Sequence, residues 1–329
     1  MTLPEIAPKP KTRAKKLEFR FSISPSPSFY STVRLAALSL RRLGSPYDTA
    51  RLVVSVGDYA TLDQIRTANA WSEDFPVEWR TVDAEAFRDQ SYLATHNDRY
   101  FAPAEGDVIF MCDSDVCLVD RIDDVIAHIG EPGPRKMAGL QAHFSPFFCV
   151  SAEQRESEWR RIFAAADLGE PPLSIAYSGD RDGAMGRAPA YFNYGLVALS
   201  RAAFDAIAPA QASCCNMMHR LTNGSFFLTQ IALSVSSVAE GVEAELLSFA
   251  YNCSNDELPF AAPDRFRINC VEEIRVIHYL RGDEIDRRAF LVDPAAYAAF
   301  MSATNLNRVN ERLRNHLATL AQYDDLLFR

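Results

Sequence analysis

The sequence predicts an α/β protein built around a mostly parallel central sheet flanked by helices. Short apolar runs typical of strands alternate with longer segments whose apolar residues recur at helical spacing. One short run, residues 108–111, is apolar at every position, as in a strand buried on both faces of a parallel sheet. With 329 residues and 48% hydrophobic content, the chain suffices for one such domain plus a helical appendage.

The first third of the chain carries strands and helices in alternation. Ser24 opens a cluster of serine and proline that turns the chain after the first strand, and Gly44 ends the first helix. The expected elements are strands over 17–23, 51–56, 77–82 and from 107 onward, and helices over 30–43, 61–71 and 92–100. This alternation predicts βαβ units, with residues 17–119 as a nucleotide-binding half.

The remainder predicts the second half of the same domain, residues 120–290. The expected elements are helices over 120–129, 151–168 and 226–238, strands over 137–150 (with a loop), 191–199 and 276–279, and a mobile acceptor or lid loop over 174–189. Residues 291–329 form a C-terminal helical extension, in which an apolar stripe over 306–327 favours packing or dimer contact. The stripe is compatible with a monomer or a homodimer.

Composition limits the kinds of partner. A net charge of −9 and a pI near 5.3 argue against nucleic acid as the main partner. No run approaches the roughly 20 apolar residues of a membrane span. Residues 1–16 are basic without an apolar core, which predicts a disordered tail, with peripheral contact to an anionic membrane as a second possibility. Seven cysteines in no disulfide or zinc pattern indicate a reducing cytoplasm.

The most informative segment is an acidic triplet that follows an apolar strand. Residues 108–111 run into Asp113 and Asp115, with Ser114 between them. Buried parallel strands end at the crevice where open α/β sheets bind ligands, and residues of one strand parity point the same way. Two converging carboxylates repel each other unless a cation neutralises them. The segment therefore predicts a divalent metal that itself holds a diphosphate.

An Asp-x-Asp triplet also occurs in calcium loops, in phosphoaspartate hydrolases and in solvated turns. A calcium loop of the EF-hand kind needs glycine at its sixth position and glutamate at its twelfth, where this chain has Leu118 and Asp124. A phosphoaspartate hydrolase needs a downstream lysine, and the only lysine after Asp115 is Lys136, which is too close for a separate strand-end motif. A solvated turn and a hydrolase stay as alternatives, but the buried type of strand before the triplet favours the metal site.

Three further segments belong with the triplet. Asn193 and Gly195 open an apolar strand, which suggests an amide presented to a ligand and a close backbone approach. His278 ends another apolar run; such a histidine is more often a core residue, although imidazole suits manganese beside oxygen ligands. Residues 250–252 form a turn. Because neither GxGxxG nor GxxxxGK[ST] occurs, phosphate must be held by the metal and by scattered basic groups.

In this order and at these separations, the segments resemble the family 8 retaining glycosyltransferases, which include glycogenin and bacterial galactosyl- and glucosyltransferases of lipopolysaccharide. The resemblance covers roughly residues 19–282 and implies a single glycosyltransferase type A fold. It implies Mn²⁺ or Mg²⁺ held by Asp113, Asp115 and His278, with a UDP-sugar as donor. The other residues it implies at the donor are Tyr30 and Ser24 in the first βα unit, Ser114, Arg99, Asn193, Gly195, Gln230 beside the anomeric carbon and Arg281, with Tyr251 and Asn252 as a structural turn.

The chain departs from the family pattern at two positions. Thr229 stands where the family usually has Asp, and Arg281 follows the histidine where the family has Lys, so Arg281 is expected to take over the diphosphate contact. The predicted function is metal-dependent transfer of a hexose from a UDP-sugar, with retention, to a saccharide, lipid-linked or protein acceptor. A nucleotide-sugar binding protein with little or no transferase activity, and a metal-dependent phosphohydrolase or nucleotidyltransferase, stay as alternatives.

Overall fold

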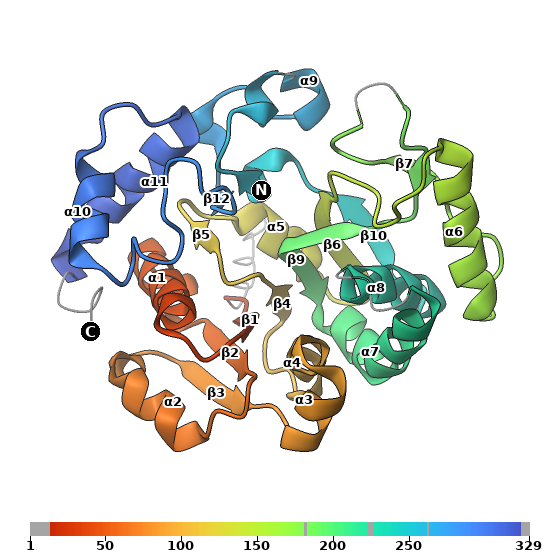
Figure 1. The fold of residues 1–329 in the computed structure, drawn as a ribbon, viewed down its shortest axis with the longest axis horizontal. Helices are drawn as coiled ribbons and strands as arrows, with labels where there is room; N and C mark the ends of the chain where they lie inside the picture. Colours follow the sequence, from red (N-terminus) through yellow and green to blue (C-terminus); the bar gives the residue numbers. More distant parts are fainter. Residues whose placement is uncertain (1–13, 181–182, 223–224, 226, 262, 324–329) are drawn as a thin grey trace, which may run out of the picture.

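The computed structural model describes residues 14–180, 183–222, 225, 227–261 and 263–323 (Figure 1). Seven strands form the central sheet, in the order β10-β6-β9-β4-β1-β2-β3. Their bounds are β1 Leu17–Ile23, β2 Arg51–Val56, β3 Val77–Thr81, β4 Val108–Met111, β6 Lys136–Gln141, β9 Phe192–Ser200 and β10 Glu243–Leu246. Strand β9 runs antiparallel to β4 and β6, and the other pairings of this sheet are parallel. The mostly parallel sheet is therefore confirmed.

Alternate residues of the central strands face two separate hydrophobic clusters, because successive side chains of a strand point to opposite faces. On one face, Phe110 stacks on Phe19 with ring centroids 4.6 Å apart, under helices α1, α2 and α5. On the other face, Ile109 and Met111 pack against α4, α7 and α8. The bounds of these helices are α1 Pro27–Leu43, α2 Leu62–Ala68, α4 Tyr92–Phe101, α5 Asp123–Ile129, α7 Arg201–Leu221 and α8 Leu228–Ala239.

A second, three-stranded sheet lies beside the carboxyl end of β4, in the order β11-β12-β5. Its strands are β5 Val116–Leu118, β11 Cys253–Ser254 and β12 Val276–His278. Strand β12 is antiparallel to β5, with His278 opposite Val116. The residues between β4 and β5 therefore connect the two sheets, and they are the acidic triplet.

The C-terminal helices pack onto this second sheet. Helix α11 (Arg308–Thr319) follows α10 (Pro294–Ser302), and its apolar stripe is fully buried in a cluster that includes Leu35 and Leu38 of α1 and Ile277 of β12. The stripe predicted over 306–327 therefore packs within the chain as far as it is described, and residues 324–327 of that prediction lie outside the described part. In the described residues, no helix is both long and apolar enough to cross a bilayer.

Several elements differ from the sequence-based expectations. Helix α7 was not predicted, nor were α3 (Ala84–Gln90) and the short strands β5 and β10. The segment 174–189, expected to be a mobile loop, contains a two-stranded sheet, and its residues 181–182 lie outside the described part. The predicted start of α8, Phe226, also lies outside it. The remaining elements are β7 Ile175–Ala176, β8 Arg187–Ala188, α6 Ala152–Ala165 and α9 Pro263–Phe266.

Candidate metal site

Backbone hydrogen bonds place the acidic triplet at the carboxyl edge of the central sheet. The amide of Asp113 donates to the Tyr194 carbonyl oxygen of β9 at 2.8 Å. The carbonyl oxygen of Asp115 accepts from the amide of Tyr279, just after β12, at 3.0 Å. The triplet is thus tied to both sheets, and β12 delivers His278 beside it. The two segments that carry the acidic residues and the histidine meet because β12 pairs with β5.

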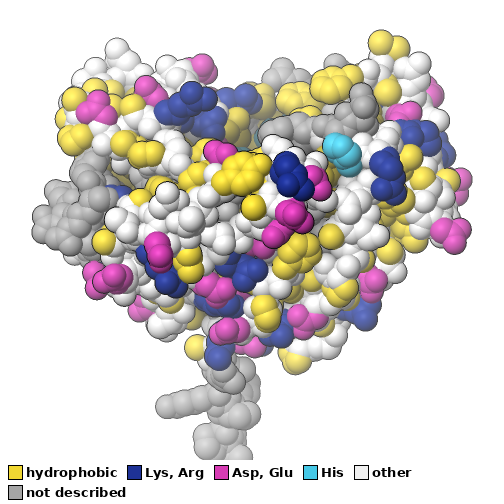
Figure 2. Space-filling model, turned by 60° about the horizontal axis from the view of Figure 1, so that its bottom comes forward, with side chains coloured by type: hydrophobic (Ala, Val, Ile, Leu, Met, Phe, Trp, Pro, Cys, Tyr) yellow, Lys and Arg dark blue, Asp and Glu magenta, His cyan; other side chains and the backbone are white. Residues whose placement is uncertain are grey.

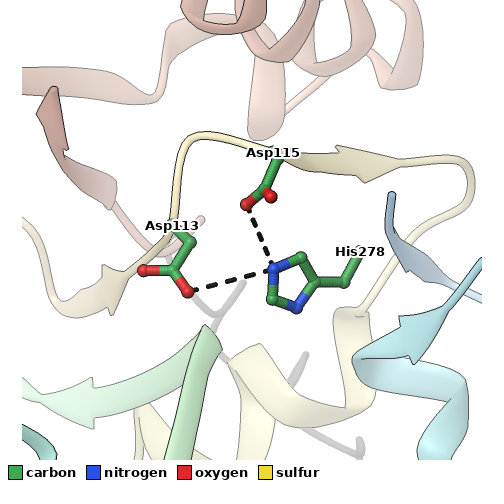
Figure 3. Close-up of side chains that lie close together, drawn as sticks. All are labelled: Asp113, Asp115 and His278. Carbon is green, nitrogen blue, oxygen red and sulfur yellow. Dashed lines mark hydrogen bonds and ion pairs between the residues drawn. The ribbon is translucent and has the colours of Figure 1, made fainter. Parts of the chain in front are cut away.

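The three side chains converge on one point (Figure 3). Nε2 of His278 lies 3.1 Å from Oδ1 of Asp115 and 3.9 Å from Oδ2 of Asp113. One ligand atom from each residue lies within 4.8 Å of the other two. Two carboxylate oxygens and an imidazole nitrogen form a set that suits Mn²⁺ and similar divalent ions. The donor set therefore fits the predicted metal.

The other nitrogen of His278 is held by an asparagine. Nδ1 of His278 lies 3.1 Å from Oδ1 of Asn252. The Asn252 amide is oriented in turn, because its Nδ2 donates to Oδ1 of Asn193 at 2.9 Å, and that oxygen also accepts from the Gly195 amide at 2.8 Å. With the amide so fixed, Nδ1 of His278 donates to Asn252, and Nε2 is the nitrogen that faces the aspartates and would be free to bind a metal.

Gly195 allows this arrangement. A Cβ atom at this position would lie 2.2 Å from Oδ1 of Asn252 and 2.5 Å from Nδ1 of His278, closer than atoms can approach. The close backbone approach predicted for Gly195 is therefore present, and it brings β9 against the asparagine and histidine. Asn193 turns its side-chain oxygen into the same network. The segment of Asn193 and Gly195 and the 250–252 turn thus both support the histidine.

The charges of the three groups are strongly coupled. Burial raises the pKa of Asp113, against the attraction of His278. Burial acts in the same way on Asp115, but His278 and Arg287 outweigh it and lower the pKa of Asp115 to about 2. Burial opposes charge on His278, yet the Asp115 carboxylate outweighs it and the pKa of His278 is raised. The site therefore favours positive charge next to Asp115, as a metal site must.

Arg287, which the sequence pattern does not indicate as a site residue, contacts the site. Nη2 of Arg287 forms an ion pair with Oδ2 of Asp115, and its Nη1 donates to the Leu280 carbonyl at 2.6 Å. Arg281, which was selected, pairs instead with Asp256, with Nε 3.1 Å from Oδ2. The only signal for Arg287 in the sequence is its position nine residues after His278.

Arg99 lies beneath the metal site and is fully buried. Its Nη1 donates to the carbonyl oxygen of Cys112 at 3.2 Å, and its guanidinium stands 4.8 Å from the centre of the Tyr194 ring. It therefore contacts the two backbone segments that position Asp113.

The remaining selected residues lie near the same edge of the sheet. Ser24 follows β1, which runs parallel to β4, and its carbonyl accepts from Ser26 at 2.9 Å. Ser114 is buried within the triplet. The Tyr30 ring is also buried and packs edge-on against Trp79, with centroids 5.8 Å apart. Gln230 stands in the first turn of α8, where the carbonyl of the preceding Thr229 accepts from the Tyr194 hydroxyl at 3.1 Å.

No protein-family model matches this chain, and no curated protein matches it in sequence. Solved structures do match. The galactosyltransferase LgtC, solved in complex with donor and acceptor sugar analogs, aligns with a TM-score of 0.56 at 14% identity over 94% of this chain and all of LgtC. The bifunctional glycosyltransferase WbbM aligns with a TM-score of 0.51 at 15% identity, over 94% of this chain and 53% of WbbM. The chain thus has the glycosyltransferase type A fold that the sequence predicted.

Proposed function

We propose that this protein is a metal-dependent glycosyltransferase that moves a hexose from a UDP-sugar to an acceptor, with retention of anomeric configuration. The observation that carries the proposal is the convergence of Asp113, Asp115 and His278 at the carboxyl edge of a type A fold. In open α/β sheets this edge is where ligands bind. The similarity to LgtC, which was solved with donor and acceptor sugar analogs, supports the same class of reaction here.

Asp113, Asp115 and His278 would hold Mn²⁺ or Mg²⁺, which when bound supplies positive charge to the departing diphosphate. Arg287 is the better candidate for the protein's own cation at the diphosphate, because it already contacts Asp115 whereas Arg281 is engaged by Asp256. A guanidinium in that position donates hydrogen bonds to phosphate oxygens and neutralises the leaving group.

The other selected residues take roles that follow from their positions. Arg99 positions the metal motif through the Cys112 carbonyl. Asn193 holds the metal histidine through Asn252 and faces the donor sugar with the rest of its amide. Gln230 would lie beside the anomeric carbon, as the resemblance to family 8 implies. The residues left for the nucleotide and diphosphate are Tyr30, Ser24 and Ser114.

The acceptor is a saccharide, a lipid-linked sugar or a protein. Segment 174–189 is the candidate acceptor loop, because loops at the ligand edge of such scaffolds determine specificity. All seven cysteines are free, which fits a reducing compartment such as the cytoplasm.

Calorimetric titration with UDP, with and without Mn²⁺, tests the donor site. We expect the parent chain to bind UDP only when the metal is present. Asp115→Asn, which keeps the size of the side chain, should show no such Mn²⁺-dependent UDP binding. Release of UDP from a panel of UDP-sugars then identifies the donor. Binding without any turnover across the panel would favour a nucleotide-sugar binding protein. The observation that favours this second candidate is Thr229, which stands where the family usually has Asp. No UDP binding in either condition would contradict the proposal.

A further inference from the structure

The loop between β6 and α6 exposes large apolar side chains. Phe144, Phe148 and Val150 are 59%, 98% and 90% exposed, and we call these three residues the apolar tip. Residues 137–152 contain no Asp, Glu, Lys or Arg. Singly exposed apolar residues are common, but three within one uncharged stretch mark a surface that binds something.

The loop holds the apolar tip in place. The Phe147 ring packs edge-on against Trp159 of α6, with centroids 5.1 Å apart. Nη2 of Arg155 donates to the Cys149 carbonyl at 2.6 Å, and the amide of Val150 donates to Oε1 of Gln154 at 3.2 Å. Phe147 thus points inward, while Phe148 and Val150, on either side of an anchored Cys149, are left facing outward. Their exposure is imposed by the surrounding contacts.

The apolar tip leaves the sheet at the edge that carries the metal site. Strands β4 and β6 are both antiparallel to β9, so they run in the same direction and their carboxyl ends meet at one edge. The Ala142 amide donates to the Tyr191 carbonyl at 2.8 Å, and the Asp113 amide donates to the Tyr194 carbonyl at the same distance. The loop and the acidic triplet are therefore attached to one short stretch of chain. Figure 2 shows a hollow between two raised lobes, with hydrophobic side chains on the rim of the right-hand lobe and Lys and Arg side chains on the rim of the left-hand lobe.

We propose that the apolar tip inserts into the interface of a lipid bilayer and holds the candidate site against an acceptor anchored in that bilayer. The part of this inference that concerns the acceptor rests on the proposed function. A bilayer accepts a few protruding aromatic and aliphatic side chains, whereas a stable protein interface buries about 800 Å² on each partner, far more than three side chains supply. Charge sets the kind of bilayer: the tip carries none and the chain carries −9. Attachment is therefore apolar and does not require anionic lipid.

Flotation with vesicles of phosphatidylcholine tests the proposal on the full chain. We expect the protein to float with these vesicles at low and high salt, without needing phosphatidylserine. The double variant Phe148→Ser/Val150→Ser should reduce the bound fraction about tenfold or more. Phe101→Ser is the matched control, because Phe101 is 57% exposed at the end of α4, shortly before β4 begins and so at the opposite edge of the sheet.

Three results would overturn the inference. The double variant could float as well as the parent chain. Flotation could require phosphatidylserine and disappear in high salt, which would assign it to the basic N-terminal residues. The parent chain could instead ignore vesicles and self-associate in light scattering, with the double variant staying monomeric, which would make the apolar tip a protein interface. UDP binding in Mn²⁺ is measured on the same samples, so a failed donor site is distinguished from a failed membrane contact.

Discussion

Nδ1 of His278 lies 3.1 Å from Oδ1 of Asn252, and this contact decides which imidazole nitrogen faces the aspartates. Groups that orient a metal-binding histidine in this way typically contribute 10–100-fold to metal affinity. We therefore expect Asn252→Ala to weaken Mn²⁺ binding by about that factor, measured by calorimetry. Asn252→Asp keeps an acceptor for Nδ1 and should bind more tightly than the alanine variant. An affinity for Asn252→Ala equal to that of the surface variant Asn269→Ala would contradict this role.

Gly195→Ala should disrupt the same network from the other side. The added methyl would lie 2.2 Å from Oδ1 of Asn252, so the asparagine or the histidine must move. Overpacking of this kind costs about 1–3 kcal/mol of unfolding free energy, and we expect Mn²⁺ affinity to fall with it. Chemical denaturation and metal titration measure the two effects. Gly169→Ala is the control, because a Cβ there meets no atom within 4 Å. Equal behaviour of the two variants would show that the close approach is unimportant.

Metal affinity should rise with pH. The pKa of His278 is raised by the Asp115 carboxylate against the effect of burial, and burial raises the pKa of Asp113. A metal ion must displace these protons when it binds. Below the raised pKa values, the metal affinity therefore increases by up to about tenfold per pH unit for each proton displaced, and above them it levels off.

Titration in two buffers of different protonation enthalpy counts the protons released. Without added metal, the free energy of unfolding should fall as the pH rises, whereas the metal affinity rises. The imidazolium stabilises the fold fully below the ordinary histidine pKa, and this stabilisation is lost as the pH rises through the raised value. A metal affinity independent of pH would contradict the ligand set. His128→Gln, at a surface histidine paired with Glu245, should leave the profile unchanged.

The candidate metal site could be predicted because its signals are local. The apolar strand 108–111 indicated burial on both faces, which the fold bears out. Asp113 and Asp115 do converge, but they follow the end of the strand and a turn at residues 114–115 brings them together, not the extended chain that the spacing argument assumed. Arg287 was not predictable in the same way. It reaches Asp115 because the chain after β12 folds back over the site, and no periodicity or turn residue indicates that path.

The missed elements have physical reasons as well. Helix α7 contains Pro209, which normally ends or kinks a helix, yet its buried residues Phe204, Ile207, Gln211 and Cys215 keep helical spacing through the proline. Strand β10 is a polar edge strand with mostly exposed side chains, so it lacks the apolar pattern by which strands are recognised. Tertiary contacts determine both elements.

Arg287→Gln should weaken UDP binding in the presence of Mn²⁺. A hydrogen bond to a charged group contributes about 1.5–3 kcal/mol, which corresponds to about ten- to hundredfold in affinity. The guanidinium is expected to supply such a bond to the diphosphate, because it already stands at Oδ2 of Asp115. Calorimetric titration of UDP in saturating Mn²⁺ measures the loss.

Arg281→Gln is the matched variant, since it removes the guanidinium that the sequence favoured for this contact. Arg281 is held by Asp256 at 3.1 Å, and loss of a half-exposed ion pair should change UDP affinity by no more than about fivefold. A larger loss of UDP affinity in Arg281→Gln than in Arg287→Gln would assign the diphosphate contact to Arg281, as the family pattern implied. Equal and large effects at both would show that two arginines share the phosphate charge, as guanidinium groups from one loop can do when the diphosphate lies between them.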